Sequence, residues 1–108
     1  MTQHIDLARG KWQTMTLAEQ LGNAGSEFGR ALKAQASHDH SRFEAATARF
    51  FELINLTVVD PRWRGPRRQE LARVKELCGH VIFGDDRAEA AGLEKYFLQF
   101  AHLARSNT

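Results

Sequence analysis

Hydrophobic residues recur along this chain at intervals of three and four positions, the spacing that places them on one face of an α-helix. Four segments have this pattern, and they predict helices over about residues 11–36, 41–59, 66–83 and 90–104. No stretch alternates between apolar and polar residues for long enough to predict a β-strand. The pattern therefore predicts an all-α protein.

Short polar sequences mark two of the predicted helix starts. Ser41 and Glu44 have the spacing of a capping box, in which each side chain bonds a free backbone N–H at the start of a helix. The start of the last helix stays open between two alternatives. A capping box at Asp86 and Glu89 is one of them, and a boundary at Gly92 is the other.

Short connections join the four predicted helices. Pro61 lies between the second and third segments and Pro66 begins the third, so we expect the chain to fold back there. Helices joined by short connections pack antiparallel around a shared core. The length of 108 residues is that of one domain. We therefore expect residues 1–108 to form a single antiparallel up-down four-helix bundle.

Composition agrees with a folded protein, with 43% hydrophobic and 26% charged residues. Cys78 is the only cysteine, which excludes an intramolecular disulfide and a multi-cysteine zinc site. We find no signal peptide and no apolar run near the ~18 residues that span a membrane. We therefore expect a cytoplasmic protein with no membrane partner, no cofactor and no metal.

Three glycines inside the first predicted helix are not explained by helix propensity. Gly22, Gly25 and Gly29 lie along one edge of the apolar face, and each costs ~1 kcal/mol relative to alanine. One interpretation is close packing against another helix of the same chain, under a large ring such as Trp63 or Phe97. The other is a dimer interface or a ligand site on this strip, and we expect a homo-oligomer.

An arginine-rich segment separates the second and third predicted helices, within a chain whose net charge is only +2. Arg67 and Arg68 lie in the first turn of the third helix, where the helix dipole disfavours cations. They either pair with nearby carboxylates or belong to a site for RNA or single-stranded nucleic acid. In that site arginines would bind phosphates and a tryptophan would stack on a base. The candidate contact residues are Arg62, Trp63, Arg64, Arg67 and Arg68.

Polar residues beside the glycine strip are a weaker candidate site. In a cleft, two carboxylates near an arginine are capable of acid/base chemistry or metal binding. Glu27 and Arg30 are three residues apart, however, and such ion pairs are ordinary on exposed helices. We therefore expect an exposed helix face here. His38 and His40 flank Asp39 in a predicted loop, but no further metal ligand follows at a suitable spacing. The band consists of Glu19, Asn23, Ser26, Glu27 and Arg30.

Arg73 and His80 lie seven residues apart on the third predicted helix, away from its apolar stripe. This pair resembles the arginine and histidine of the HEPN nucleases, which are small helical bundles. The resemblance implies metal-independent RNA cleavage at a dimer interface. Val74 departs from that pattern, because the family tends to have a polar residue after the arginine. We predict no catalytic residue, and we interpret Cys78 as a buried, inert thiol.

Four strings that together span most of the chain carry a resemblance: LAEQLGNAGSEFGRALK, DPRWRG, ELCGHVIFGD and LEKYFLQFAHLAR (residues 17–33, 60–65, 76–85 and 93–105). With them the chain resembles a group of small bacterial helical proteins that have no assigned activity. The resemblance implies a four-helix bundle and carries over no functional residue. In general shape the chain is also similar to the bundles encoded by ribosomal RNA intervening sequences and to accessory proteins of diversity-generating retroelements, which oligomerise and bind nucleic acid.

We therefore expect a small, non-enzymatic interaction module that self-associates through a helix face. The alternative is nucleic-acid binding through the arginine and tryptophan cluster, with HEPN-like RNA cleavage as its extension.

Overall fold

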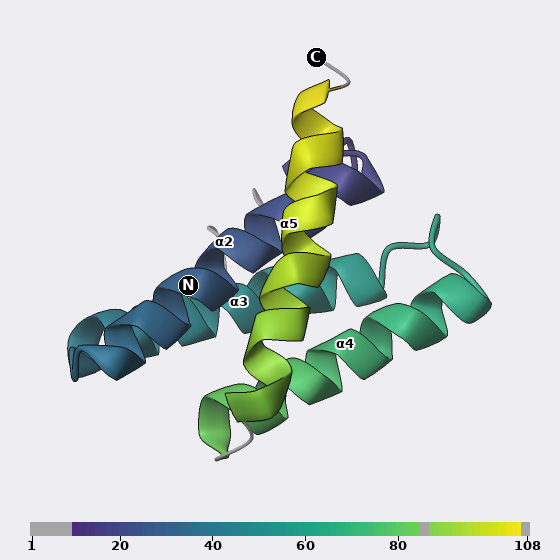
Figure 1. Cartoon of the computed structure of the whole chain (residues 1–108). Coiled ribbons are helices and arrows are strands. Elements are labelled where there is room, and N and C mark those ends of the chain that lie inside the picture. The colour runs from purple at the N-terminus through teal and green to yellow at the C-terminus, as the bar shows by residue number, and fades with distance from the viewer. Residues whose placement is uncertain (1–9, 85–86, 107–108) are drawn as a thin grey trace.

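The computed structural model describes residues 10–84 and 87–106, and this part of the chain is helical without any strand (Figure 1). The predicted all-α class is confirmed. A helical turn at residues 10–12 precedes the main helices. These are α2 (Leu17–Ala36), α3 (His40–Val58), α4 (Pro66–Phe83) and α5 (Ala90–Ser106), with a short 3-10 helix, η1 (Arg87–Glu89), before α5.

The first long helix begins later than the predicted residue 11, because Thr16 caps it. The Thr16 hydroxyl accepts a hydrogen bond from the backbone N–H of Glu19 at 3.1 Å. The Glu19 carboxylate in turn accepts one from the backbone N–H of Thr16 at 2.8 Å. This capping box ends the helix on its N-terminal side. The residues before it form a separate segment, whose Trp12 is buried in the core.

The other boundaries lie close to the predicted ones. Asp39 rather than Ser41 caps α3, since its carboxylate accepts from the backbone N–H of Arg42 at 3.1 Å. Helix α5 begins at residue 90, so Gly92 lies inside the helix. Asp86, part of the alternative capping box, falls outside the described residues.

Helices α2, α3 and α4 run in alternating directions, and α5 crosses over them obliquely (Figure 1). Helix α2 packs along α3 and against α5, so it touches neighbours on two sides. The core is centred on the rings of Phe28, Phe50 and Phe97, whose centroids lie 5.5 to 6.0 Å apart. Because one of these rings belongs to α5, the crossing helix is part of the core.

Candidate functional site

The segment between α3 and α4 is built around the carboxylate of Asp60, which is 1% exposed. The guanidinium of Arg62 donates to both carboxylate oxygens, at 3.0 Å from Nε and 2.8 Å from Nη2. The backbone N–H of Arg62 adds a bond at 3.0 Å, and the Gln20 amide of α2 adds one at 2.9 Å. Chiefly through the Arg62 side chain, these donors lower the pKa of Asp60 from 3.8 to about 2.

Gln20 extends this network to both tryptophans. Its Nε2 also donates to the backbone carbonyl of Trp12 at 2.8 Å, and its Oε1 accepts from Nε1 of Trp63 at 2.8 Å. The indole N–H of Trp12 donates to the Thr57 hydroxyl of α3 at 2.9 Å. Buried polar groups are costly unless they are paired, so this network joins the N-terminal segment, α2, α3 and the loop into one unit.

Arg62 is held on both sides of its guanidinium. Besides its bonds to Asp60, its Nη2 donates to the backbone carbonyl of Met15 at 2.7 Å. Its central carbon lies 4.5 Å from the centre of the Trp63 ring, in a cation–π contact. The face of the Trp63 ring is therefore in contact with an arginine of its own segment, and its N–H is hydrogen-bonded to Gln20.

Arg68 has a structural role that explains a cation at the start of α4. Its guanidinium donates to the carbonyls of Val58 and Asp60, both at 2.8 Å. Val58 is the last residue of α3 and Asp60 follows two residues later, so the guanidinium lies at the C-terminal end of α3, where the helix dipole favours a positive charge. Arg64 donates to the carbonyl of Pro61 at 2.8 Å. The preference of the α3 C-terminus therefore outweighs the penalty at the start of α4.

Arg67 pairs with Glu70 on the same helix, at 3.1 Å. The same Glu70 oxygen accepts a hydrogen bond from the Tyr96 hydroxyl of α5 at 2.6 Å. Burial and the neighbouring Glu70 carboxylate raise the pKa of Tyr96. All five residues predicted to contact nucleic acid thus have a partner within the chain.

The glycine strip faces α5 of the same chain. A Cβ atom added at Gly25 would lie 2.3 Å from the Cβ of Phe97, and one at Gly22 would lie 3.2 Å from the Cα of Ala101. At Gly29 the nearest atom is a Glu94 carboxylate oxygen, 3.9 Å away. This is the geometry of close helix packing under Phe97. The approach is tightest at Gly25 and absent at Gly29.

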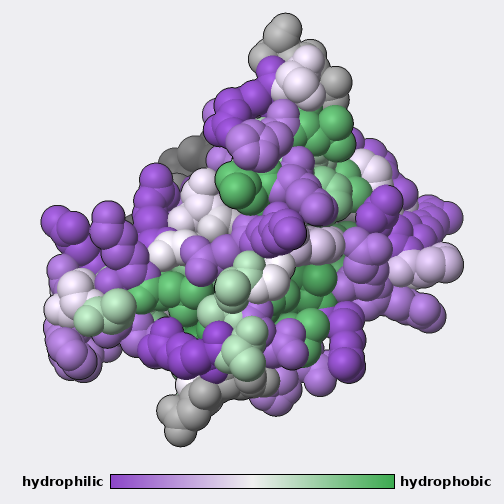
Figure 2. Space-filling view, viewed as in Figure 1, coloured by the Kyte–Doolittle hydropathy of each residue, from purple (hydrophilic) through white to green (hydrophobic). Residues whose placement is uncertain are grey.

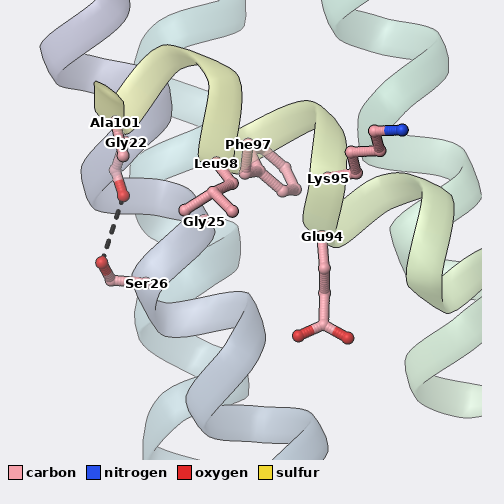
Figure 3. Close-up of a pocket in the computed structure, with 8 residues that line it drawn as sticks. All are labelled: Gly22, Gly25, Ser26, Glu94, Lys95, Phe97, Leu98 and Ala101. Atoms are coloured by element: carbon pink, nitrogen blue, oxygen red, sulfur yellow. Dashed lines mark hydrogen bonds between the residues drawn. The ribbon is translucent and has the colours of Figure 1, made fainter. Parts of the chain in front are cut away.

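A groove of about 400 Å³ remains open beside this helix crossing (Figure 3). Leu98 lies next to Gly25 at its edge and is 52% exposed. The Glu94 and Lys95 side chains point in different directions from the same turn of α5. We call this surface the α5 groove. It is lined by Gly22, Gly25, Ser26, Glu94, Lys95, Phe97, Leu98 and Ala101.

Apolar surface continues along the upper half of α5 among polar side chains (Figure 2). Leu103, near the end of α5, is 49% exposed. Leu98 is a residue that the sequence did not single out. Two other large apolar side chains, Val59 and Phe83, are exposed elsewhere, and Phe83 stacks on Phe51.

The polar band on α2 lies beside two grooves, because Ser26 lines the α5 groove and Glu27 and Arg30 line a second groove between α2 and α3. Glu27 and Arg30 form the expected ion pair at 2.8 Å. The Asn23 amide donates to the carbonyl of Glu19, and the Ser26 hydroxyl donates to that of Gly22. Within residues 10–84 and 87–106, no group of three His, Cys, Asp or Glu side chains has a metal-binding arrangement.

The remaining candidate residues are on α4, with Arg73 and His80 on its surface and Cys78 in the core. Arg73 and His80 are both exposed on α4, and His80 lies 3.9 Å from Glu76. Cys78 is fully buried, and this burial raises the pKa of its thiol to about 12. A thiol that stays protonated in the core is a poor nucleophile.

Comparison with protein-family models, with curated proteins and with solved structures finds no match for this chain. None of the described helices is long and apolar enough to cross a membrane.

Proposed function

We propose that this protein is a non-enzymatic interaction module that self-associates through the α5 groove. In this proposal it is a cytoplasmic, antiparallel up-down four-helix bundle whose last helix is tilted, so that one face of α5 is left open. The observation that carries the proposal is the exposed side chain of Leu98 beside a hollow lined by Gly22 and Gly25. The polar side chains around Asp60 support a non-enzymatic role, because they hydrogen-bond one another and hold the N-terminal segment, α2 and the loop together.

A second copy of the chain fits this surface because the surface is complementary to itself. A two-fold dimer places the same patch of each subunit against the other. The projecting Leu98 and the adjacent hollow then fill one another reciprocally. Glu94 and Lys95 at the edge supply one negative and one positive charge, so unlike charges can face each other across the axis.

Sedimentation equilibrium over a range of concentrations tests this proposal. We expect the wild-type chain to sediment above its monomer mass of 12.2 kDa. Leu98→Gln should weaken association by about tenfold or more, because a two-fold interface loses the leucine twice. Val59→Gln is the matched control, since it removes another exposed apolar side chain, 65% exposed against 52% for Leu98, away from the groove. A monomer at millimolar concentration, or equal effects of the two substitutions, would contradict the proposal.

Nucleic-acid binding is the alternative proposal. The observation in its favour is that Arg64 and Arg67 remain on the surface at the start of α4, although each has a partner within the chain. Fluorescence anisotropy with a single-stranded RNA tests it. Salt-sensitive binding that weakens in the double variant Arg64→Gln, Arg67→Gln would support this alternative. Binding of the same affinity in the wild type and the double variant would contradict it.

A further inference from the structure

A second groove, of about 640 Å³, lies between the last part of α2 and the first part of α3. Its lining includes the small side chains of Ala34 of α2 and of Ala45 and Ala46 of α3. Small residues at this helix contact leave room between the longer side chains on either side. The volume is within the ~300 to 1,000 Å³ range of small-molecule sites.

Four cationic side chains line this groove, two from each helix. Arg30 and Lys33 of α2 are three residues apart, and Arg42 and Arg49 of α3 are seven apart, so each pair shares one helix face. The carboxylates in the same lining are those of Glu27 and Asp39. Cations therefore outnumber carboxylates by four to two, within a chain whose net charge is only +2.

Each arginine is oriented by a carboxylate of its own helix or cap. Arg30 pairs with Glu27 at 2.8 Å, and Arg42 pairs with Asp39 at 3.5 Å. Arg49 bonds Glu52, which lies outside the lining.

These carboxylates leave donor capacity for a ligand. Arg42 is exposed over 85% of its side chain, so its ion pair is weak and leaves several N–H donors available. Lys33 has no salt bridge within the described residues.

We propose that this groove, the α2/α3 groove, binds a small phosphate-bearing anion with two or more negative charges. Guanidinium groups on both walls match the geometry of phosphate oxygens, which accept pairs of parallel N–H bonds. The lining residues include no aromatic side chain, so the groove offers phosphate contacts without a stacking platform for bases. Its chemistry therefore favours a compact polyphosphate over single-stranded nucleic acid.

This inference is independent of self-association, because the α2/α3 groove and the α5 groove share no residue. A chain that stays monomeric can still bind an anion here, and Leu98→Gln should leave anion binding unchanged.

Isothermal titration calorimetry with inorganic tripolyphosphate tests the proposal at low salt. We expect saturable binding of one anion per chain. Lys33→Gln combined with Arg42→Gln should weaken it by about tenfold or more, since each substitution removes a charged hydrogen-bond donor. The backbone N–H of Arg42 that bonds Asp39 is kept in this variant, so the start of α3 stays capped.

The matched control is Arg73→Gln with Lys75→Gln on α4, which removes the same charge elsewhere. Equal weakening in both double variants would show attraction to net charge alone and overturn the proposal. So would the lack of saturation at about 5 mM tripolyphosphate. Tighter binding of a single-stranded RNA of equal charge, lost in the Lys33 and Arg42 variant, would overturn the assignment to a small anion.

Discussion

The substitution Gly25→Ala tests how α5 is held against α2. Its new methyl group would lie 2.3 Å from the Cβ and 2.7 Å from the Cγ of Phe97. Carbon atoms in contact are ~3.5 Å apart, so the two helices would have to separate by roughly 1 Å. The Phe97 ring cannot swing away, because it is 3% exposed and packs against Phe28 and Phe50 at 5.7 and 6.0 Å.

Two effects of opposite sign decide the result. Alanine inside a helix is favoured over glycine by ~1 kcal/mol. Overpacking of a tight core contact costs up to ~3 kcal/mol, and the upper end applies where neither partner can move. We therefore expect Gly25→Ala to lower the free energy of unfolding by about 2 kcal/mol. For a domain of this size the melting temperature should fall by roughly 10 °C.

Gly29→Ala is the matched control, because its methyl group would meet only a Glu94 carboxylate oxygen at 3.9 Å. It should raise stability by up to ~1 kcal/mol through helix propensity. Gly22→Ala, whose methyl group would lie 3.2 Å from the Cα of Ala101, should fall between the two. Urea and thermal unfolding followed by circular dichroism measure all three variants. If Gly25→Ala stabilised the protein as much as Gly29→Ala, the close crossing of α2 and α5 would be refuted.

Three further predictions concern buried chemistry. The lowered pKa of Asp60, about 2 against an ordinary 3.8, means that the unfolded chain takes up this proton first as the pH falls. The ionised Asp60 should therefore contribute about 2 kcal/mol of stability above pH 4, and this contribution should be lost towards pH 2. Urea unfolding across that range should show a smaller loss of stability in Asp60→Asn than in the wild type. Arg68→Ala removes the hydrogen bonds to the carbonyls of Val58 and Asp60 and should lower the free energy of unfolding by about 2 kcal/mol. Arg64→Ala should lower it by less than ~0.5 kcal/mol. Equal losses of stability in urea unfolding would argue against the capping role of Arg68. Because burial raises the pKa of Cys78 to about 12, a disulfide reagent at pH 8 should modify it only as fast as the protein opens, and rapid modification of the native protein would disprove this.

The amino-acid sequence alone determined the helices, because helix formation depends on local information. Apolar spacing and nearby caps placed α3, α4 and α5 within a few residues of their positions in the structure. The predicted start of the first helix, residue 11, was wrong for a reason that is also local, because α2 begins at Leu17. Thr16 and Glu19 have capping-box spacing, but the apolar pattern continues through them and favoured a longer helix.

The candidate site depended on contacts between distant residues, which only the tertiary structure decided. The glycine strip predicted close packing under a ring such as Trp63 or Phe97, but the sequence did not decide between these two partners. The partners proved to be Phe97 and Ala101, more than 70 residues away from the glycines that they meet. Arg68 likewise suited the start of α4 poorly, because the favourable acceptors belong to the end of α3. Periodicity reports which face of a helix is buried. The identity of the opposing face is set by the packing of the whole chain, where shape and hydrogen bonds must be satisfied together.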